Sequence, residues 1–288
     1  MKKLLSLLCT IFITVTLTGC FKSDSMDDIN IYTSVYPVEY IVTSLYQKHA
    51  DINSIYPDGI VVDTYKPTSK LIKDYSECDL FIYNGLSKEK EYAKDMLNIN
   101  KKMKIIDVSM GMEYVNGIEE LWLDPSNFLM MAQNVRNGFK EYISNTYLKK
   151  EIDENYDNLK LQASELDATL KSIVENADDK TIVVSNDTFK YLEKYGFTVI
   201  SLEENDNLTD KVIADTNRLI QNGKINYIFI KKYEKANDTI QNILNTTSVT
   251  LLTVDTISSI SEDDRENKED YITLMKKNID LFKKELYQ

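Results

Sequence analysis

The 288-residue sequence is poor in several residue types, and each shortage narrows its fold and chemistry. It has one histidine, His49, so sites that need paired imidazoles are excluded. Eight glycines and four prolines favour long regular elements over a loop-rich β protein. Neither a Gly-x-Ser-x-Gly elbow nor a phosphate-binding loop occurs. We therefore expect no enzyme activity.

Cysteine is also scarce, and two of the three cysteines belong to the N-terminal segment. That segment has a short basic start, an apolar run over residues 4–17 and the ending Leu17-Thr-Gly-Cys20. The pattern predicts a secretory signal over residues 1–19 and lipid attachment to Cys20, as in bacterial lipoproteins. An ordinary signal peptide or an N-terminal membrane anchor is the alternative. Only Cys78 then remains as a thiol, so the mature chain forms no internal disulfide.

Basic residues are outnumbered by acidic ones, 34 to 46. Removal of residues 1–19 takes away Lys2 and Lys3 and leaves 32 basic against 46 acidic residues, a net charge of −14. Such a charge argues against nucleic-acid binding and against electrostatic docking on anionic lipid. We expect a domain held at the extracytoplasmic face of the cell membrane by its lipid, through a tether over residues 20–28.

Short apolar runs alternate with amphipathic patterns in two blocks of the chain. This alternation predicts an α/β fold with two lobes of parallel sheet flanked by helices, over residues 29–146 and 179–288. The expected strands are residues 29–35, 52–56, 80–83, 105–108, 181–185, 198–202, 227–230 and 250–254. The expected helices are residues 38–47, 68–75, 87–97, 188–195, 209–221, 237–244 and 270–286.

Residues 147–178 predict one long, rigid helix that bridges the lobes. Apolar or small residues recur every three or four positions from Leu148 to Ile173, without Gly or Pro. Because a continuous helix is a stiff connector, we expect only a small closure of the lobes on binding. A coiled-coil dimer arm is the alternative, whereas a helix packed along both lobes fits a monomer.

Polar residues at strand ends are the candidate site, because ligands of α/β proteins bind at the carboxyl ends of strands. Asp63 follows the second expected strand, and Glu119 and Glu120 precede residues 121–125. Asn186 and Asp255 follow strands of the second lobe. Such Asp and Asn residues also form turns and helix caps, so spacing alone leaves both roles open.

Four segments resemble one known family in order along the chain. They are residues 31–37, residues 77–86, the motif Trp122-Leu-Asp-Pro125 and residues 185–196. Together they are similar to the zinc- and manganese-binding solute-binding lipoproteins of ABC transporters, and the resemblance covers nearly the whole mature chain. It implies two lobes on one rigid helix, a metal ion between them, and an ABC permease with its ATPase as partners.

The resemblance also implies the metal ligands, which would be Asp63, Glu120, Asn186 and Asp255. The family has His at the first two positions and His or Glu at the third, while Lys231 stands at a position that is often acidic. Three carboxylates and an amide favour a hard divalent cation, Mn, Ca or Mg, over Zn. The sequence leaves open whether Glu119 or Glu120 faces the cleft.

A second interpretation is that metal binding has been lost. The ammonium group of Lys231 or Lys232 would then take the place of the cation and neutralise Asp255. The cleft would bind another small solute, or the same scaffold would act as a surface adhesion or interaction protein.

Overall fold

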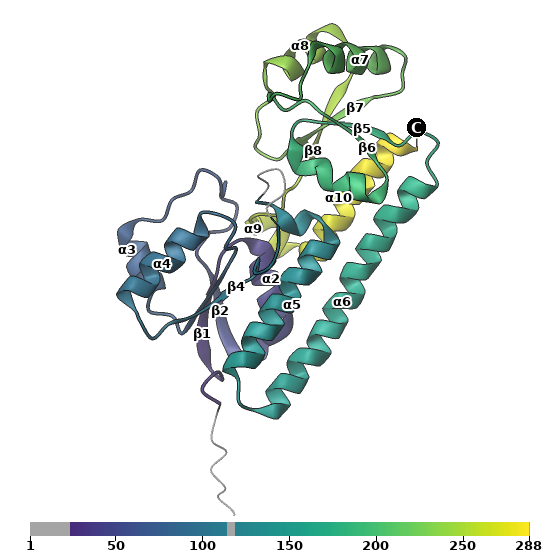
Figure 1. The fold of residues 1–288 in the computed structure, drawn as a ribbon. Coiled ribbons are helices and arrows are strands. Elements are labelled where there is room, and N and C mark those ends of the chain that lie inside the picture. The colour runs from purple at the N-terminus through teal and green to yellow at the C-terminus, as the bar shows by residue number, and fades with distance from the viewer. Residues whose placement is uncertain (1–23, 114–118, 288) are drawn as a thin grey trace, which may run out of the picture.

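The computed structural model describes residues 24–113 and 119–287, and it contains two four-stranded parallel sheets (Figure 1). The first sheet has the order β2-β1-β3-β4 and the second has the order β6-β5-β7-β8. The strands are β1 Ile29–Thr33, β2 Ala50–Ser54, β3 Leu80–Tyr83, β4 Lys104–Asp107, β5 Thr181–Val184, β6 Thr198–Ser201, β7 Tyr227–Lys231 and β8 Thr250–Val254. The predicted fold class is confirmed, because each block of alternating patterns forms its own sheet. The predicted signal and Cys20 lie outside the described residues.

Helices cover both faces of the first sheet. They are α2 Tyr36–Tyr46, α3 Ser69–Tyr75, α4 Glu89–Ile99 and α5 Pro125–Tyr142, with 3-10 turns η1 Gln47–His49 and η3 Leu121–Leu123. In Figure 1, α3 and α4 lie on the opposite side of the sheet from α5. Strand β3 is buried along its whole length, as expected for a central parallel strand between two helical layers.

The second half of the chain also forms the 3-10 helix η4 and four α-helices. They are η4 Asp187–Tyr195, α7 Asp210–Gln221, α8 Asp238–Thr246, α9 Glu262–Glu266 and α10 Tyr271–Leu286. Of these, α9 lies beside α2 of the first lobe (Figure 1). A separate apolar cluster around Ile228 and Ile240 fills the space under α7 and α8. The main core is continuous from the first lobe through α10 into the second, so the two sheets share one hydrophobic interior.

The long helix predicted over residues 147–178 is α6, Thr146–Glu175. Asn145 caps its N-terminus by accepting a hydrogen bond from the Tyr147 amide at 2.9 Å. Its buried residues include every predicted stripe position from Leu148 to Ile173. The stripe packs on α5 and α10, so α6 contacts both lobes (Figure 1).

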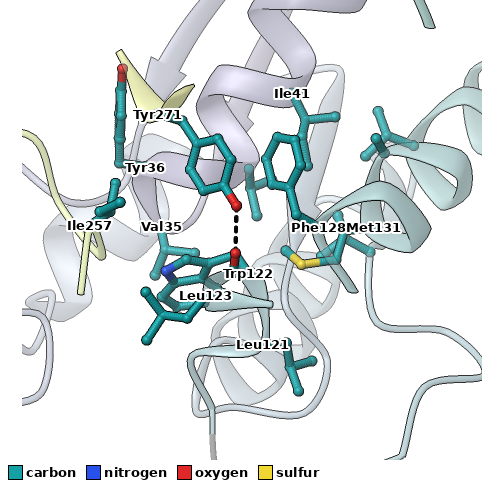
Figure 2. Close-up of a cluster of buried hydrophobic side chains, with 14 of the residues drawn as sticks. Val35, Tyr36, Ile41, Leu121, Trp122, Leu123, Phe128, Met131, Ile257 and Tyr271 are labelled. Atoms are coloured by element: carbon teal, nitrogen blue, oxygen red, sulfur yellow. Dashed lines mark hydrogen bonds between the residues drawn. The ribbon is translucent and has the colours of Figure 1, made fainter. Parts of the chain in front are cut away.

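An aromatic cluster joins the lobes where the Trp122 motif meets α10 (Figure 2). The rings of Phe128 and Tyr271 stack with centroids 3.9 Å apart. The Tyr271 hydroxyl donates a hydrogen bond to the Trp122 carbonyl at 2.5 Å. Trp122 itself is 2% exposed, so this motif, one of the four segments that carry the family resemblance, is part of the interlobe core.

Three segments differ from the expectation. No helix was predicted at α5, although Phe128, Met131, Val135 and Phe139 form its buried stripe, and none was predicted at the short helix α9. The tether predicted over residues 20–28 is already folded at its end. Asp24 accepts hydrogen bonds from the amides of Ser144 and Asn145, just before α6, and Met26 is fully buried. Among the described residues, no helix combines the length and apolar character needed to span a bilayer.

Candidate functional site

A small cleft lies between the lobes at the carboxyl ends of three strands. Loops after β2, β7 and β8 line it, together with Glu120. Its volume is about 40 Å³. Three of the four predicted ligands, Asp63, Glu120 and Asp255, are among its lining residues, and Asn186 is not. The sequence therefore located the cleft and three of its acidic residues.

The loop after β8 carries Asp255 and ties it to the first lobe. The Trp122 indole N–H donates to the Thr256 carbonyl at 2.6 Å, and the Tyr36 amide donates to the Ser258 carbonyl at 3.0 Å. The Ser259 hydroxyl donates to the Ile60 carbonyl at 2.8 Å. Asp255 belongs to the second sheet by sequence, yet its loop is fixed to the lobe that provides Asp63 and Glu120.

Two lysines occupy the cleft beside its acidic residues. The Lys231 ammonium lies 2.9 Å from Glu120 Oε1, and the Lys232 ammonium lies 2.7 Å from Asp255 Oδ2. Burial alone would lower the pKa of each lysine, but Glu120 and Asp255 outweigh it and raise the two pKa values above normal. Both lysines are therefore charged at neutral pH. The sequence left open whether Lys231 or Lys232 neutralises Asp255. In the structure Lys232 pairs with Asp255, and Lys231 pairs with Glu120.

Asn186 has a different set of partners. Its Oδ1 caps η4 by accepting from the Thr188 amide at 2.9 Å. Its Nδ2 donates to Glu234 Oε1 at 3.2 Å. The other oxygen of Glu234 accepts from the Ser185 hydroxyl at 2.6 Å and from the Lys231 amide at 3.0 Å. Asn186 thus supports the turn that carries the lysines. Sequence reasoning missed Glu234, because it contacts residues 48 and 49 positions away.

The loop that carries Asp63 is fixed by Lys88. The Lys88 ammonium donates to the carbonyls of Val62, Asp63 and Tyr65, the last two at 3.3 and 3.2 Å. Nearby, burial and the negative charges of Glu120 and Asp63 raise the pKa of Glu119. Glu120, not Glu119, is the residue that lines the cleft.

Behind this loop lies a buried carboxyl group, Glu89, which is 1% exposed. Its Oε1 accepts a 2.6 Å hydrogen bond from the Tyr56 hydroxyl, while its Oε2 has no hydrogen-bond partner in the described part of the chain. Burial raises the pKa of Glu89 to about 7, although the Tyr56 hydrogen bond opposes the shift.

In residues 24–113 and 119–287, no group of three or more His, Cys, Asp or Glu side chains is close enough to hold a metal ion. In the cleft, two of the three acidic side chains instead meet a lysine. The cleft therefore holds two carboxylate–ammonium pairs, Glu120 with Lys231 and Asp255 with Lys232, beside the carboxylate of Asp63.

Comparison with known proteins now identifies the family. The model of the family described as ZnuA, the periplasmic component A of the zinc-uptake complex, matches residues 31–285. The chain belongs to the ZnuA family. The resemblance inferred from the four sequence segments is therefore confirmed, and the chain is a solute-binding component of an uptake system.

Individual relatives of this ZnuA-family chain are distant. The manganese ABC transporter substrate-binding lipoprotein PsaA of Streptococcus anginosus is 29% identical over an alignment of 221 positions, which covers 68% of this chain and 70% of PsaA. The high-affinity zinc uptake system protein ZnuA of Bacillus subtilis is 20% identical over an alignment of 299 positions, which covers 90% of this chain and 88% of the relative. The Zn(II)-bound ZnuA-like domain of Streptococcus pneumoniae AdcA shares the fold, with a TM-score of 0.74, 22% identity, and coverage of 91% of this chain and 100% of that domain.

Proposed function

We propose that this ZnuA-family chain captures one divalent cation in the interlobe cleft and delivers it to an ABC permease driven by its ATPase. The supporting observation is that carboxylates from both lobes, Asp63, Glu120 and Asp255, line a single small cleft. Its volume of about 40 Å³ suits an ion with one or two waters. Pockets for small organic ligands measure roughly 300–1,000 Å³, so size favours an ion over an organic solute.

The chemistry of the cleft favours a hard cation. Among the residues that the structure describes, no imidazole or thiolate lines it, and its side chains offer carboxylate oxygens. Such ligands suit Mn²⁺, Ca²⁺ or Mg²⁺, whereas Zn²⁺ prefers sites with His or Cys. One relative is named for manganese and another for zinc. The oxygen ligands of this chain favour manganese over zinc.

The protein would act at the extracytoplasmic face of the membrane, anchored through lipid on Cys20. Four positions after Cys20, Asp24 is already packed on the domain and accepts a hydrogen bond from the Asn145 amide at 2.7 Å. A linker this short spans at most about 14 Å, so the domain would stay close to the permease in the same membrane.

The ion pairs of Lys231 and Lys232 favour a second candidate function. If both ammonium groups remain paired with Glu120 and Asp255, they neutralise two of the three carboxylates in the cleft, and the cleft then has little attraction for a cation. The scaffold would then bind another solute or serve as an interaction surface.

Thermal melts separate the two candidates. The protein is dialysed against a chelator, and its melting temperature is then measured with added Mn²⁺, Ca²⁺, Mg²⁺ or Zn²⁺. A ligand that binds only the folded state stabilises that state by about 2.7 kcal/mol at a concentration of 100 times its Kd, and this raises Tm. We expect the largest rise in Tm with a hard cation, a loss of that rise in Asp255→Asn, and its retention in the control Asp206→Asn, which changes an exposed carboxylate. If no cation raises Tm, cation capture is contradicted, and the remaining candidate is the function without a metal ion.

A further inference from the structure

The turn that carries Lys231 and Lys232 is held in place by specific contacts. Glu234 accepts hydrogen bonds from the Lys231 amide and the Ser185 hydroxyl, and the Glu234 amide returns a bond to the Lys231 carbonyl at 3.1 Å. The Lys232 amide continues the β7–β8 pairing by donating to the Val254 carbonyl at 2.8 Å. The backbone therefore directs both side chains into the cleft.

The next residue in this turn adopts a backbone conformation that non-glycine residues rarely take. Tyr233 has φ of 69°, in the left-handed region, and its side chain is 58% exposed. A non-glycine residue in that region raises the free energy of the folded state by about 1 kcal/mol. Such a conformation persists only where the surrounding contacts hold the backbone in it. The geometry of the turn is thus imposed by its contacts with Glu234 and β8.

The lysines engage the same oxygen atoms that a captured cation would use. Both oxygens of Asp255 are occupied, since Oδ1 accepts from the Ile257 amide at 2.7 Å and Oδ2 pairs with Lys232. Glu120 and Lys231 are only 12% and 19% exposed, so their pair is shielded from water. A cation cannot coordinate Asp255 Oδ2 fully while the Lys232 ammonium remains 2.7 Å from that oxygen.

We infer that Lys231 and Lys232 are tethered cations that an incoming divalent ion must displace, and that they set the affinity and selectivity of the cleft. This inference rests on the proposed function. One divalent ion carries the charge of both ammonium groups and approaches carboxylate oxygens more closely, at ~2.3–2.6 Å for Ca²⁺, against 2.9 and 2.7 Å for the two lysine nitrogens. A monovalent ion carries only half of the charge that it would have to replace.

The Lys232 ammonium also contacts a group other than the carboxylate. It lies 5.4 Å from the centroid of the exposed Tyr233 ring, within the range of a cation–π contact, while it is paired with Asp255. This contact gives the ammonium a partner that remains when an incoming cation takes the carboxylate.

Titration calorimetry with MnCl₂ on the chelator-dialysed protein tests the inference. Lys231→Met and Lys232→Met remove the ammonium groups while keeping side-chain length, and we expect each to tighten Mn²⁺ binding by at least about tenfold, which is 1.4 kcal/mol. The controls are Lys231→Arg, which keeps the charge, and Lys235→Met, which removes an exposed lysine from the same turn. Both controls should bind Mn²⁺ no more tightly than the wild type.

The possible results test separately the role of the two lysines and the capture of a cation by the cleft. Wild-type protein that binds Mn²⁺ as tightly as both Met variants overturns the inference and leaves cation capture intact. Absence of binding in the wild type and all variants overturns both. Tighter binding confined to the Met variants supports the inference. Should Lys231→Met fail to fold, Lys232→Met carries the test, because Lys232 is 31% exposed and its loss buries no unpaired group completely.

Discussion

The buried Glu89 gives a prediction whose size follows from the structure. Its pKa is about 7 in the folded protein, against 4.5 when unfolded, because burial disfavours the carboxylate. The folded state therefore binds more protons than the unfolded state between these two values. The stability contributed by protonated Glu89 is full below about pH 4.5 and is lost as the pH rises to about 7.

The magnitude can be worked out by linkage. A shift of about 2.5 units corresponds to about 3 kcal/mol, of which about 2.5 kcal/mol falls between pH 5 and pH 8. Glu89→Gln removes the titration. The free energy of unfolding of the wild type should therefore fall by about 2.5 kcal/mol more than that of the variant over this range. The buried Gln amide adds a cost that is equal at both pH values and cancels in the comparison.

Urea unfolding at pH 5 and pH 8 measures this difference. Glu91→Gln is the matched control, since it removes an exposed carboxylate from the same helix and should keep the wild-type dependence. The reasoning is refuted if Glu89→Gln loses as much stability between pH 5 and pH 8 as the wild type does.

Three further predictions concern the lobe contacts and the anchor. Arg265→Met breaks a clamp between α9 and the first lobe, and we expect a loss of about 1–2 kcal/mol in urea unfolding, because the 40% exposed side chain is partly screened. Trp122→Phe leaves the Thr256 carbonyl without its indole donor and should cost about 2–4 kcal/mol in the same assay, with weaker Mn²⁺ binding in calorimetry since Asp255 lies in that loop. Cys20→Ser should move the protein from the membrane fraction to the soluble fraction and abolish labelling with radioactive palmitate.

Most of the fold was predictable because its signals are local. Continuous apolar runs such as residues 80–83 read as buried parallel strands, and the stripe from Leu148 to Ile173 read as one helix. Helix α5 was missed, although its apolar residues have helical spacing, because its start coincides with the Trp122 motif.

The site was predictable only in part. Strand-end position pointed to Asp63 and Asp255, since strand ends meet at one edge of a sheet. The family resemblance, through the position two residues before Trp122, added Glu120. The sequence pattern could not show which residue pairs with Lys231, because the Lys231–Glu120 pair joins residues 111 positions apart across the two lobes. Local spacing carries no information about such a contact.

Equilibrium dialysis against Mn²⁺, followed by metal analysis, tests cation capture most directly. The chelator-treated chain is compared with Asp255→Asn, which removes the carboxylate that pairs with Lys232. Cation capture in the cleft predicts one Mn²⁺ per wild-type chain and a marked loss in the variant. Wild-type protein that retains no Mn²⁺, or a variant that retains as much as the wild type, contradicts it.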